Sequence, residues 1–191
     1  DFLPERIDFA LTLPEGPLSA MAQVPVDIAA RYLFGAPGAG LGVEGEYRLT
    51  PARVLPGAEG YLFGRHDDAT GPRYQSLVGT TTDAAGAASL RVVFSDEAQA
   101  ASLPLEARFT LRVREGSGRP VEREATRVLM PRTPVIGIKP AFADGVVPEG
   151  TEAGFDLIAL GPDAAQVDLP VTWVLNLIET DYQWYSLYGE W

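Results

Sequence analysis

The stretch LEARFTLRVREGSGRPVEREATRVLM, residues 105–130, decides the fold. In its first part every second residue is apolar and the residues between are charged or polar. A strand with one buried face has this period of two. EGSGRP is typical of a turn, so residues 121–130 are predicted to return as a partner strand. The expected inward positions are Leu105, Ala107, Phe109, Leu111 and Val113, and the expected outward positions are Glu106, Arg108, Thr110, Arg112 and Arg114.

The same alternation recurs along the chain and predicts an all-β protein. Strands are expected at 7–13, 24–34, 43–50 and 90–94, with one weak strand at 74–78 inside a long connection rich in glycine, proline and aspartate. With the hairpin, this makes about seven strands, the count of an antiparallel β-sandwich. The best helix candidate, residues 96–102, is too short to stand alone. The first 132 residues are therefore predicted to form one complete sandwich.

A second module is expected after a proline-rich connector. Pro131, Pro134 and Pro140 predict a stiff, extended link, which sets the domains at 1–132 and 133–191. Strands are predicted at 135–138, 155–159 and 169–177, and the aromatic end DYQWYSLYGEW is a candidate for one more. About four strands are too few to close a sandwich. The second module is therefore expected to be incomplete at Trp191. The predicted fold class is tandem antiparallel β-sandwiches of fibronectin-like or immunoglobulin-like architecture.

Composition narrows the classes of partner. The 191 residues carry 26 acidic against 15 basic side chains, a net charge of -11, which argues against nucleic acid. No apolar run approaches the roughly 20 residues of a membrane-spanning helix, so no direct membrane insertion of this segment is expected. There is no cysteine, which removes disulfides, thiol catalysis and the common zinc motifs. Because the sequence opens on Asp1 without a leader, we expect an excerpt of a longer or processed chain.

One motif is typical of proteins that bind a dinucleotide cofactor. Residues 40–45, GLGVEG, spell G-x-G-x-x-G, the fingerprint of a dinucleotide-binding turn. That turn needs a helix after the glycines to hold the pyrophosphate. Here the following residues alternate as a strand, and Pro51 and Pro56 come next. Lys139 is the only lysine, so a P-loop is absent as well. No cofactor is therefore predicted, and Gly35, Pro37, Gly38 and Gly40 are expected to shape a turn between two strands.

Candidate metal and catalytic groups are sparse. His66, the only histidine, stands beside Asp67 and Asp68 in a polar loop, where a solvated turn is the expected role. Serine and threonine nucleophiles lack a plausible base and a G-x-S-x-G elbow. Glu44 and Glu46 are expected on the solvated face of a strand.

Two further groups of side chains belong to the second module in sequence. Calcium between the modules is an alternative reading of Asp144, Glu149 and Glu152, although no dense acidic motif supports it. The aromatic cluster is expected to lie partly in the core of the second module and partly against further residues of a longer chain. Stacking against a sugar ring is the alternative role. This cluster comprises Trp173, Tyr182, Trp184, Tyr185, Tyr188 and Trp191. No catalytic, cofactor-binding or metal-ligating residue is predicted.

Two stretches carry a family resemblance. RYLFGAPGAG, residues 31–40, is similar to the Tyr-x-Tyr-Gly-x-Pro strand end of macroglobulin-like domains, with Phe34 in place of the second tyrosine. TTTDAAGAASLRV, residues 80–92, resembles the Thr-Asp-x-x-Gly-x-Ala turn of the same domains through Thr82, Asp83, Gly86 and Ala88. Residues 135–163 and 169–185 look like the following domain of bacterial alpha-2-macroglobulins. In the turn, Asp83 is expected to cap its own backbone and Gly86 to adopt a positive φ.

The resemblance implies a large periplasmic protein that traps a broad range of proteases, and a lipid anchor to the inner membrane is an option for such a parent. In that family a protease cuts a bait segment, the molecule rearranges around it, and many members attach covalently through a Cys-Gln thioester. This chain holds no identifiable bait and, without cysteine, no thioester. Its expected role is therefore a non-enzymatic scaffold, whose partners are neighbouring macroglobulin-like domains and, through the parent protein, target proteases.

Two other classes stay open at this point. One is an extracytoplasmic adhesin or carbohydrate-binding β-sandwich that uses Trp184 or Trp191. The other is an accessory or catalytic β-domain of a hydrolase. Glycan binding by the aromatic cluster would favour the first, and turnover by the purified chain would favour the second.

Overall fold

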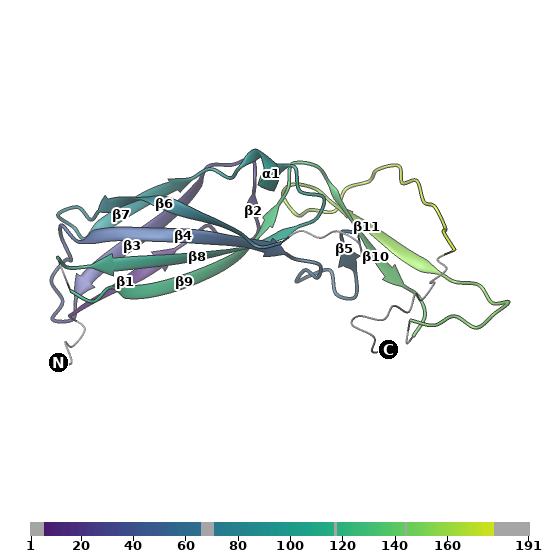
Figure 1. Cartoon of the computed structure of the whole chain (residues 1–191), viewed down its shortest axis with the longest axis horizontal. Helices are drawn as coiled ribbons and strands as arrows, with labels where there is room; N and C mark the ends of the chain where they lie inside the picture. The colour runs from purple at the N-terminus through teal and green to yellow at the C-terminus, as the bar shows by residue number, and fades with distance from the viewer. Residues whose placement is uncertain (1–5, 66–70, 117, 144, 178–191) are drawn as a thin grey trace, which may run out of the picture.

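The computed structural model describes residues 6–65, 71–116, 118–143 and 145–177, and in these the regular secondary structure is almost all strand (Figure 1). Within these described ranges there is one short helix, α1, which covers Asp96–Gln99 inside the predicted 96–102. The strands are β1 (Ile7–Thr12), β2 (Leu18–Ser19), β3 (Val24–Tyr32), β4 (Gly42–Pro51), β5 (Leu62–Phe63), β6 (Arg73–Thr81), β7 (Ala87–Val92), β8 (Leu105–Arg114), β9 (Val121–Met130), β10 (Val135–Pro140) and β11 (Phe155–Leu160). The predicted all-β class is confirmed.

The first part of the chain forms a β-sandwich. One sheet has the strand order β1-β3-β7 and the other β2-β9-β8-β4-β6 (Figure 1). All pairings are antiparallel except that of β2 with β9, where two residues run parallel. Their inner faces form one core, in which Phe9 and Val26 of the first sheet join Val43 and Phe109 of the second. The sandwich is thus built by strands that bury alternate residues.

The hairpin at residues 105–130 has the predicted form. β8 and β9 pair from Leu105↔Leu129 to Val113↔Val121. All five predicted inward side chains of β8 are at most 2% exposed, because β8 lies between β9 and β4 and faces the opposite sheet. The outward positions of β8 are exposed or half-buried.

Strand β6 is longer than the sequence predicts. It extends over nine residues, where a weak strand at 74–78 was expected, and it ends its sheet next to β4. Within the described part of the chain, nothing pairs with its outer edge, and Tyr74 and Val78 are 65% and 88% exposed. Its sequence, RYQSLVGTT, lacks the alternation of apolar and polar residues by which strands are recognised. This agrees with its position in the sheet, where no residue of β6 is fully buried.

The second part of the chain is joined to the first through a shared cluster, called the joint here. Strand β5, which lies in the connection after β4, pairs with β10, and β11 completes the order β11-β10-β5. Gly137 of β10 lies so close to the Phe63 ring that an added Cβ would stand 2.7 Å from it. The buried residues of the joint are Leu55, Ala58, Phe63, Met130, Val135 and Leu160.

The strand predicted at 169–177 is wrong for this structure. After β11 the chain makes one isolated bridge, Leu160↔Gln166, and then continues to residue 177 without strand pairing. Trp173 and Leu175 are 77% and 84% exposed. An alternating apolar sequence forms a strand only where a surface covers its apolar face, and no described element covers this one. The strand expected in the aromatic end falls outside the described residues.

Candidate functional site

The two motifs of the sequence resemblance meet in space. The β3–β4 connection carries the first and the β6–β7 turn the second, and we call their contact the turn clamp, residues 30–41 with 82–87. The backbone N–H of Ala30 donates to the carbonyl of Gly86 at 2.8 Å, and that of Gly40 donates to the carbonyl of Thr82 at 3.0 Å. These bonds tie the end of one sheet to the end of the other.

Thr82 is the central side chain of the turn clamp. It is 4% exposed and is the one buried polar side chain among the described residues. Its hydroxyl donates to the carbonyl of Gly38 at 2.6 Å and accepts from the N–H of Leu41 at 2.9 Å. A threonine at this position therefore satisfies a donor and an acceptor of the opposite turn, which would otherwise be buried without partners.

Asp83 and Gly86 have the predicted local roles. The Asp83 carboxylate accepts from the N–H groups of Ala85 at 2.8 Å and Ala87 at 2.9 Å, which closes the turn before β7. Gly86 adopts a φ of +80°, and a Cβ added there would overlap the carbonyl oxygen of Ala30. Glycine is required here both for its torsion and for the close approach of two backbones.

The G-x-G-x-x-G motif, residues 40–45, begins in this turn and continues into a strand. Gly40 has a φ of +69°, and β4 begins at Gly42, where a dinucleotide turn would begin a helix. Gly45 lies inside β4 against Leu111 and Thr110 of β8, with no room for a Cβ. The spacing of these glycines therefore serves a tight turn and close strand packing. The predicted strand after the motif is confirmed.

The tip beside the turn clamp is apolar and exposed. Leu33 and Phe34 are 65% and 80% exposed. The Phe34 ring stacks on Tyr32 at 5.2 Å between centroids. Tyr32 in turn donates to Glu115 at 2.8 Å, and this hydrogen bond raises the pKa of the tyrosine. The exposed rings are thus held in place by the end of β3.

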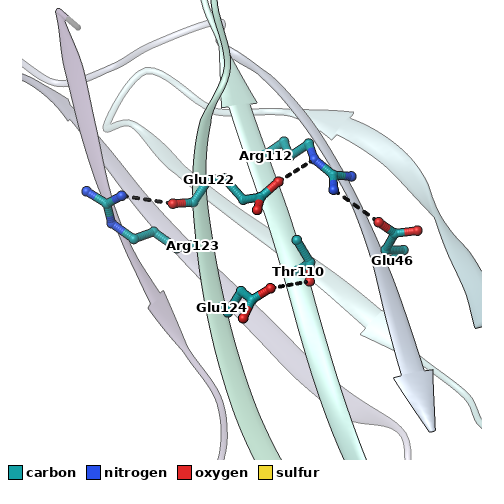
Figure 2. Close-up of polar contacts among 6 residues, drawn as sticks. All are labelled: Glu46, Thr110, Arg112, Glu122, Arg123 and Glu124. Atoms are coloured by element: carbon teal, nitrogen blue, oxygen red, sulfur yellow. Dashed lines mark hydrogen bonds and ion pairs between the residues drawn. The ribbon is translucent and has the colours of Figure 1, made fainter.

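The outer face of the five-stranded sheet carries paired charges (Figure 2). Arg112 of β8 reaches Glu122 of β9 at 2.6 Å and Glu46 of β4 at 3.1 Å. Hydrogen bonds from Arg112 to Glu46 and then Glu122 raise the pKa of this arginine. Next along the sheet, Arg114 pairs with Glu44 at 2.6 Å. Glu44 and Glu46 therefore lie on the solvated face, as predicted, each opposite an arginine.

One cluster of charges links the two sheets. Arg123 of β9 donates to the Asp8 carboxylate of β1 at 2.8 Å, and Arg31 of β3 lies 3.5 Å from the same carboxylate. The partial burial of Asp8 raises its pKa, but the hydrogen bonds from Arg123, from the Phe9 backbone and from Arg31 outweigh this, so the pKa lies below its ordinary value. This side of the sandwich is therefore bridged by an ion pair.

The opposite side of the sandwich is a groove between β6 and β7. Its volume is about 490 Å³, and its lining contains one charged side chain, Arg91, and the serines Ser76, Ser89 and Ser95. No histidine or carboxylate lines it. A serine without a base lacks the activation that nucleophilic catalysis needs.

The candidate metal positions are not assembled in the part of the chain that is described. There, no group of three or more histidine, cysteine, aspartate or glutamate side chains could hold a metal ion. Glu149 and Glu152 are exposed in the connection between β10 and β11. Asp144, the His66 to Asp68 group and the aromatic side chains from 182 to 191 lie outside the described residues. Over the same described ranges, no helix is long and apolar enough to cross a membrane.

The contacts that sequence reasoning missed are those made between distant segments. The turn clamp joins residues 44 positions apart through Thr82 and Gly38, and the joint brings Phe63 to β10. The only sequence signal for either was local: a Thr-Asp turn in one case, and a short apolar pair in a loop in the other.

The two motifs that meet in the turn clamp are those that carry the resemblance to macroglobulin-like domains, and the family comparisons agree. The family model described as the bacterial alpha-2-macroglobulin MG5 domain matches residues 5–131, and that of bacterial macroglobulin domain 6 matches residues 137–191. The chain belongs to the bacterial alpha-2-macroglobulin family.

Relatives of known sequence are much longer than this chain. It is 31% identical to alpha-2-macroglobulin of Escherichia coli K12 over 96% of its own length and 12% of the relative's. It is 32% identical to alpha-2-macroglobulin of Xylella fastidiosa Temecula1 over its whole length and 12% of the relative's. The chain therefore spans about an eighth of these relatives.

Solved structures give the same assignment. The native conformation of E. coli alpha-2-macroglobulin superposes with a TM-score of 0.65 at 27% identity, covering 87% of this chain and 11% of that one. The trypsin-activated E. coli protein gives a TM-score of 0.66 at 28% identity, covering 87% and 12%. Salmonella alpha-2-macroglobulin reacted with methylamine gives 0.62 at 28% identity, covering 83% and 11%.

Proposed function

We propose that this chain is a structural scaffold segment of a bacterial alpha-2-macroglobulin-like, broad-spectrum protease inhibitor. The observation that carries the proposal is the succession of the two macroglobulin matches, MG5 followed directly by domain 6, in one chain. Two solved structures of the Escherichia coli relative are described as activated, one by trypsin and one by porcine elastase. By extension, the parent of this chain would react with proteases, and this segment would help to shape the trap.

The joint supports a scaffold role. Phe63 is fully buried between the modules, and β5 of the first module supplies an edge to β10 of the second. Paired strands and a shared apolar cluster restrict the rotation of one module against the other, whereas a free linker would leave their angle open. A segment that fixes an angle can transmit a rearrangement of its neighbours.

The proposal extends to partners, location and activity. Neighbouring macroglobulin-like domains of the same protein would be the direct partners, and target proteases would be met through the parent. The parent would act in the periplasm, the location that the family resemblance implies. As a scaffold, the chain would have no enzymatic turnover of its own.

Trapping by the full-length parent tests this function. The parent is incubated with trypsin, and the remaining activity is measured on a small peptide substrate and on a large protein substrate. We expect activity on the small substrate to survive and activity on the large one to be lost, because an enclosed protease stays open only to small molecules. Full activity on both substrates with every protease tried would contradict the inhibitor proposal.

A substitution in the joint tests the scaffold role separately. In the parent, Phe63→Ala removes the buried ring, and Leu62→Ala, at a half-exposed neighbour on β5, is the matched control. We expect Phe63→Ala to reduce trapping severalfold and Leu62→Ala to leave it unchanged. Hydrogen exchange of β8 and β9 shows whether the first sandwich is still folded. Normal trapping by a Phe63→Ala protein whose joint has lost its exchange protection would contradict the scaffold role.

A further inference from the structure

The described chain enters the first sandwich beside the apolar tip, the name used here for Tyr32, Leu33 and Phe34. The N–H of Leu33 donates to the carbonyl of Arg6, the first described residue, at 2.9 Å. Directly afterwards, β1 pairs with β3 from Ile7↔Tyr32 onward. β3 ends, and β4 begins, at the end of the sandwich that lies farthest from the joint (Figure 1). Chain that precedes Arg6 in the parent would therefore arrive at the apolar tip.

The rings of the apolar tip are exposed and yet held in one position. Phe34 is 80% exposed and stacks on Tyr32 with the ring planes 17° apart. Tyr32 is itself fixed by its hydrogen bond to Glu115 at 2.8 Å. The backbone forms a tight turn, in which the N–H of Gly35 donates to the carbonyl of Tyr32 and the N–H of Tyr32 to that of Ala36, both at 2.8 Å. Because these side chains are already ordered, a partner that covers them loses little affinity to their immobilisation.

The joint shows what covers an apolar ring at the other end of the same sandwich. There the chain leaves the first module at Met130, and Phe63 of β5 packs in the same cluster. Phe63 is fully buried, because β10 of the following module pairs with β5 and Leu160 of β11 joins the cluster. At the entry end, Phe34 stands beside Arg6, but no described module covers it. The entry end thus has an aromatic anchor without a covering module.

The apolar tip differs from the other exposed apolar positions of the first module. Leu33 and Phe34 are consecutive and are 65% and 80% exposed. Met21, Val54 and Val93 are also exposed, but each stands alone in the sequence. Single exposed apolar side chains are normal on a protein surface, whereas a contiguous group marks a contact site. Aromatic side chains on an ordered backbone are typical anchors of such sites.

We propose that the apolar tip is the docking surface for the module that directly precedes this chain in the parent, with Leu33 and Phe34 packed against apolar side chains of that module. The inference rests on the proposed function, because it takes the chain as a segment of a longer macroglobulin-like protein. The matched domains are numbered 5 and 6, and the chain covers 12% of its relatives. The first match begins at residue 5, next to the contact between Arg6 and Leu33.

Tethering favours this occupant over a separate molecule. A preceding module is attached to the chain at the tip itself, which raises its effective concentration there. The tip is small, and a small apolar contact is sufficient between modules that are already linked. With the joint at one end and this contact at the other, the first sandwich would be fixed at both ends.

Photo-crosslinking in the full-length parent identifies what covers the tip. The variant Phe34→p-benzoylphenylalanine keeps an aromatic ring at an exposed position. The matched control, Tyr74→p-benzoylphenylalanine, places the same group at a 65% exposed aromatic residue of β6, which pairs with Arg48 toward the far end of β4. Both proteins are irradiated before any protease is added. Crosslinked peptides are identified by mass spectrometry.

We expect position 34 to crosslink mainly to peptides of the preceding module in the same molecule, and about tenfold more than position 74 does, because an anchor residue is in direct contact with its partner. Crosslinks mainly to another module, or between two molecules of the parent, would assign the tip to a different occupant and overturn the proposal. Equal yields at the two positions, or no crosslink at position 34, would also overturn it.

A second measurement needs no substitution. Hydroxyl-radical oxidation of Leu33 and Phe34 is compared between the purified 191-residue chain and the full-length parent, with the fully buried Phe109 as the baseline in both. We expect oxidation of the tip to be severalfold slower in the parent. Equal rates in the two proteins would refute the docking.

Trapping of trypsin, measured on the same parent sample, separates this inference from the proposed function. A parent that traps trypsin while its tip is oxidised as fast as in the purified chain contradicts the docking alone. A parent that protects the tip but traps no protease contradicts the inhibitor proposal and supports the docking.

Discussion

At the scale of single residues, the hydroxyl of Thr82 decides how well the turn clamp holds. Thr82→Val keeps the shape of the side chain but leaves the carbonyl of Gly38 and the N–H of Leu41 without this partner. Each unsatisfied buried group costs about 1–3 kcal/mol, so we expect a loss of about 2–4 kcal/mol in the free energy of unfolding. Urea denaturation of the purified chain measures it. Thr82→Ser, which keeps the hydroxyl, is the control, and an equal loss in both variants would contradict this role.

Two glycines of the turn clamp separate torsional strain from steric overlap. Gly40 and Gly86 both have positive φ, but a Cβ meets nothing within 4 Å at Gly40, whereas at Gly86 it overlaps Ala30. We expect Gly40→Ala to destabilise by about 1–2 kcal/mol. Gly86→Ala adds overpacking and should cost roughly 3 kcal/mol or more. Thermal unfolding of both variants measures these losses of stability. Equal losses would show that the backbone of Ala30 moves aside to accommodate the added Cβ at position 86.

Residue-level prediction succeeded where the cause is local. The roles of Asp83 and Gly86 follow from a carboxylate two residues before an N–H and from a torsion that only glycine adopts easily. The role of Thr82 does not, because its partners Gly38 and Leu41 lie about forty positions earlier in the chain. A threonine in a turn carries no sequence signal for which distant backbone it will meet.

At the scale of elements, the two faces of β8 differ sharply in what a substitution costs. Leu111 is fully buried, and Leu111→Ala should lower the free energy of unfolding by about 2–5 kcal/mol. Its neighbour Arg112 holds two half-exposed ion pairs, and Arg112→Gln should cost less than about 1 kcal/mol. Urea denaturation at low and high salt measures both. A large loss of stability for Arg112→Gln that does not depend on salt would contradict this prediction. It would mean that Arg112 stabilises the sheet by more than its half-exposed ion pairs.

The ion pair that bridges the two sheets should respond to acid. The pKa of the Asp8 carboxyl is lowered in the folded chain, so its stabilising effect is complete above the ordinary aspartate pKa of about 4 and is lost as the pH falls through the folded value. We expect the Asp8→Asn variant to have a lower free energy of unfolding than the unsubstituted chain at pH 7, and this difference in free energy to shrink below pH 4. Urea midpoints across that range test this, and a difference independent of pH would remove the carboxylate as its cause.

Elements were predictable when one face was buried and the other solvated. β8 shows this pattern from Leu105 to Arg114, and its boundaries were predicted from it. β6 was underestimated because it has no buried face, so its length is set by pairing with β4 alone. The segment 169–177 failed in the opposite way: its alternation is clear, but the surface it needs is not supplied by the described chain.

At the scale of the whole molecule, the joint makes the second module dependent on the first. Four of the six buried residues of the joint come from the first module: Leu55, Ala58, Phe63 and Met130. We therefore expect residues 133–191 alone to show no cooperative unfolding, and residues 1–132 to unfold cooperatively, because the main core lies within them. Circular dichroism during thermal unfolding of both pieces tests this. Cooperative unfolding of 133–191 alone would show that the joint is a contact between independently stable units.

The bare edge of β6 has a practical consequence for handling the protein. From Gln75 to Thr81 it carries no charge and no proline, and it ends its sheet without a partner in the described chain. Natural proteins usually guard such an edge against intermolecular strand addition. We therefore expect concentrated samples to associate through this strip of backbone, and Val78→Lys, at an 88% exposed position, to slow that association.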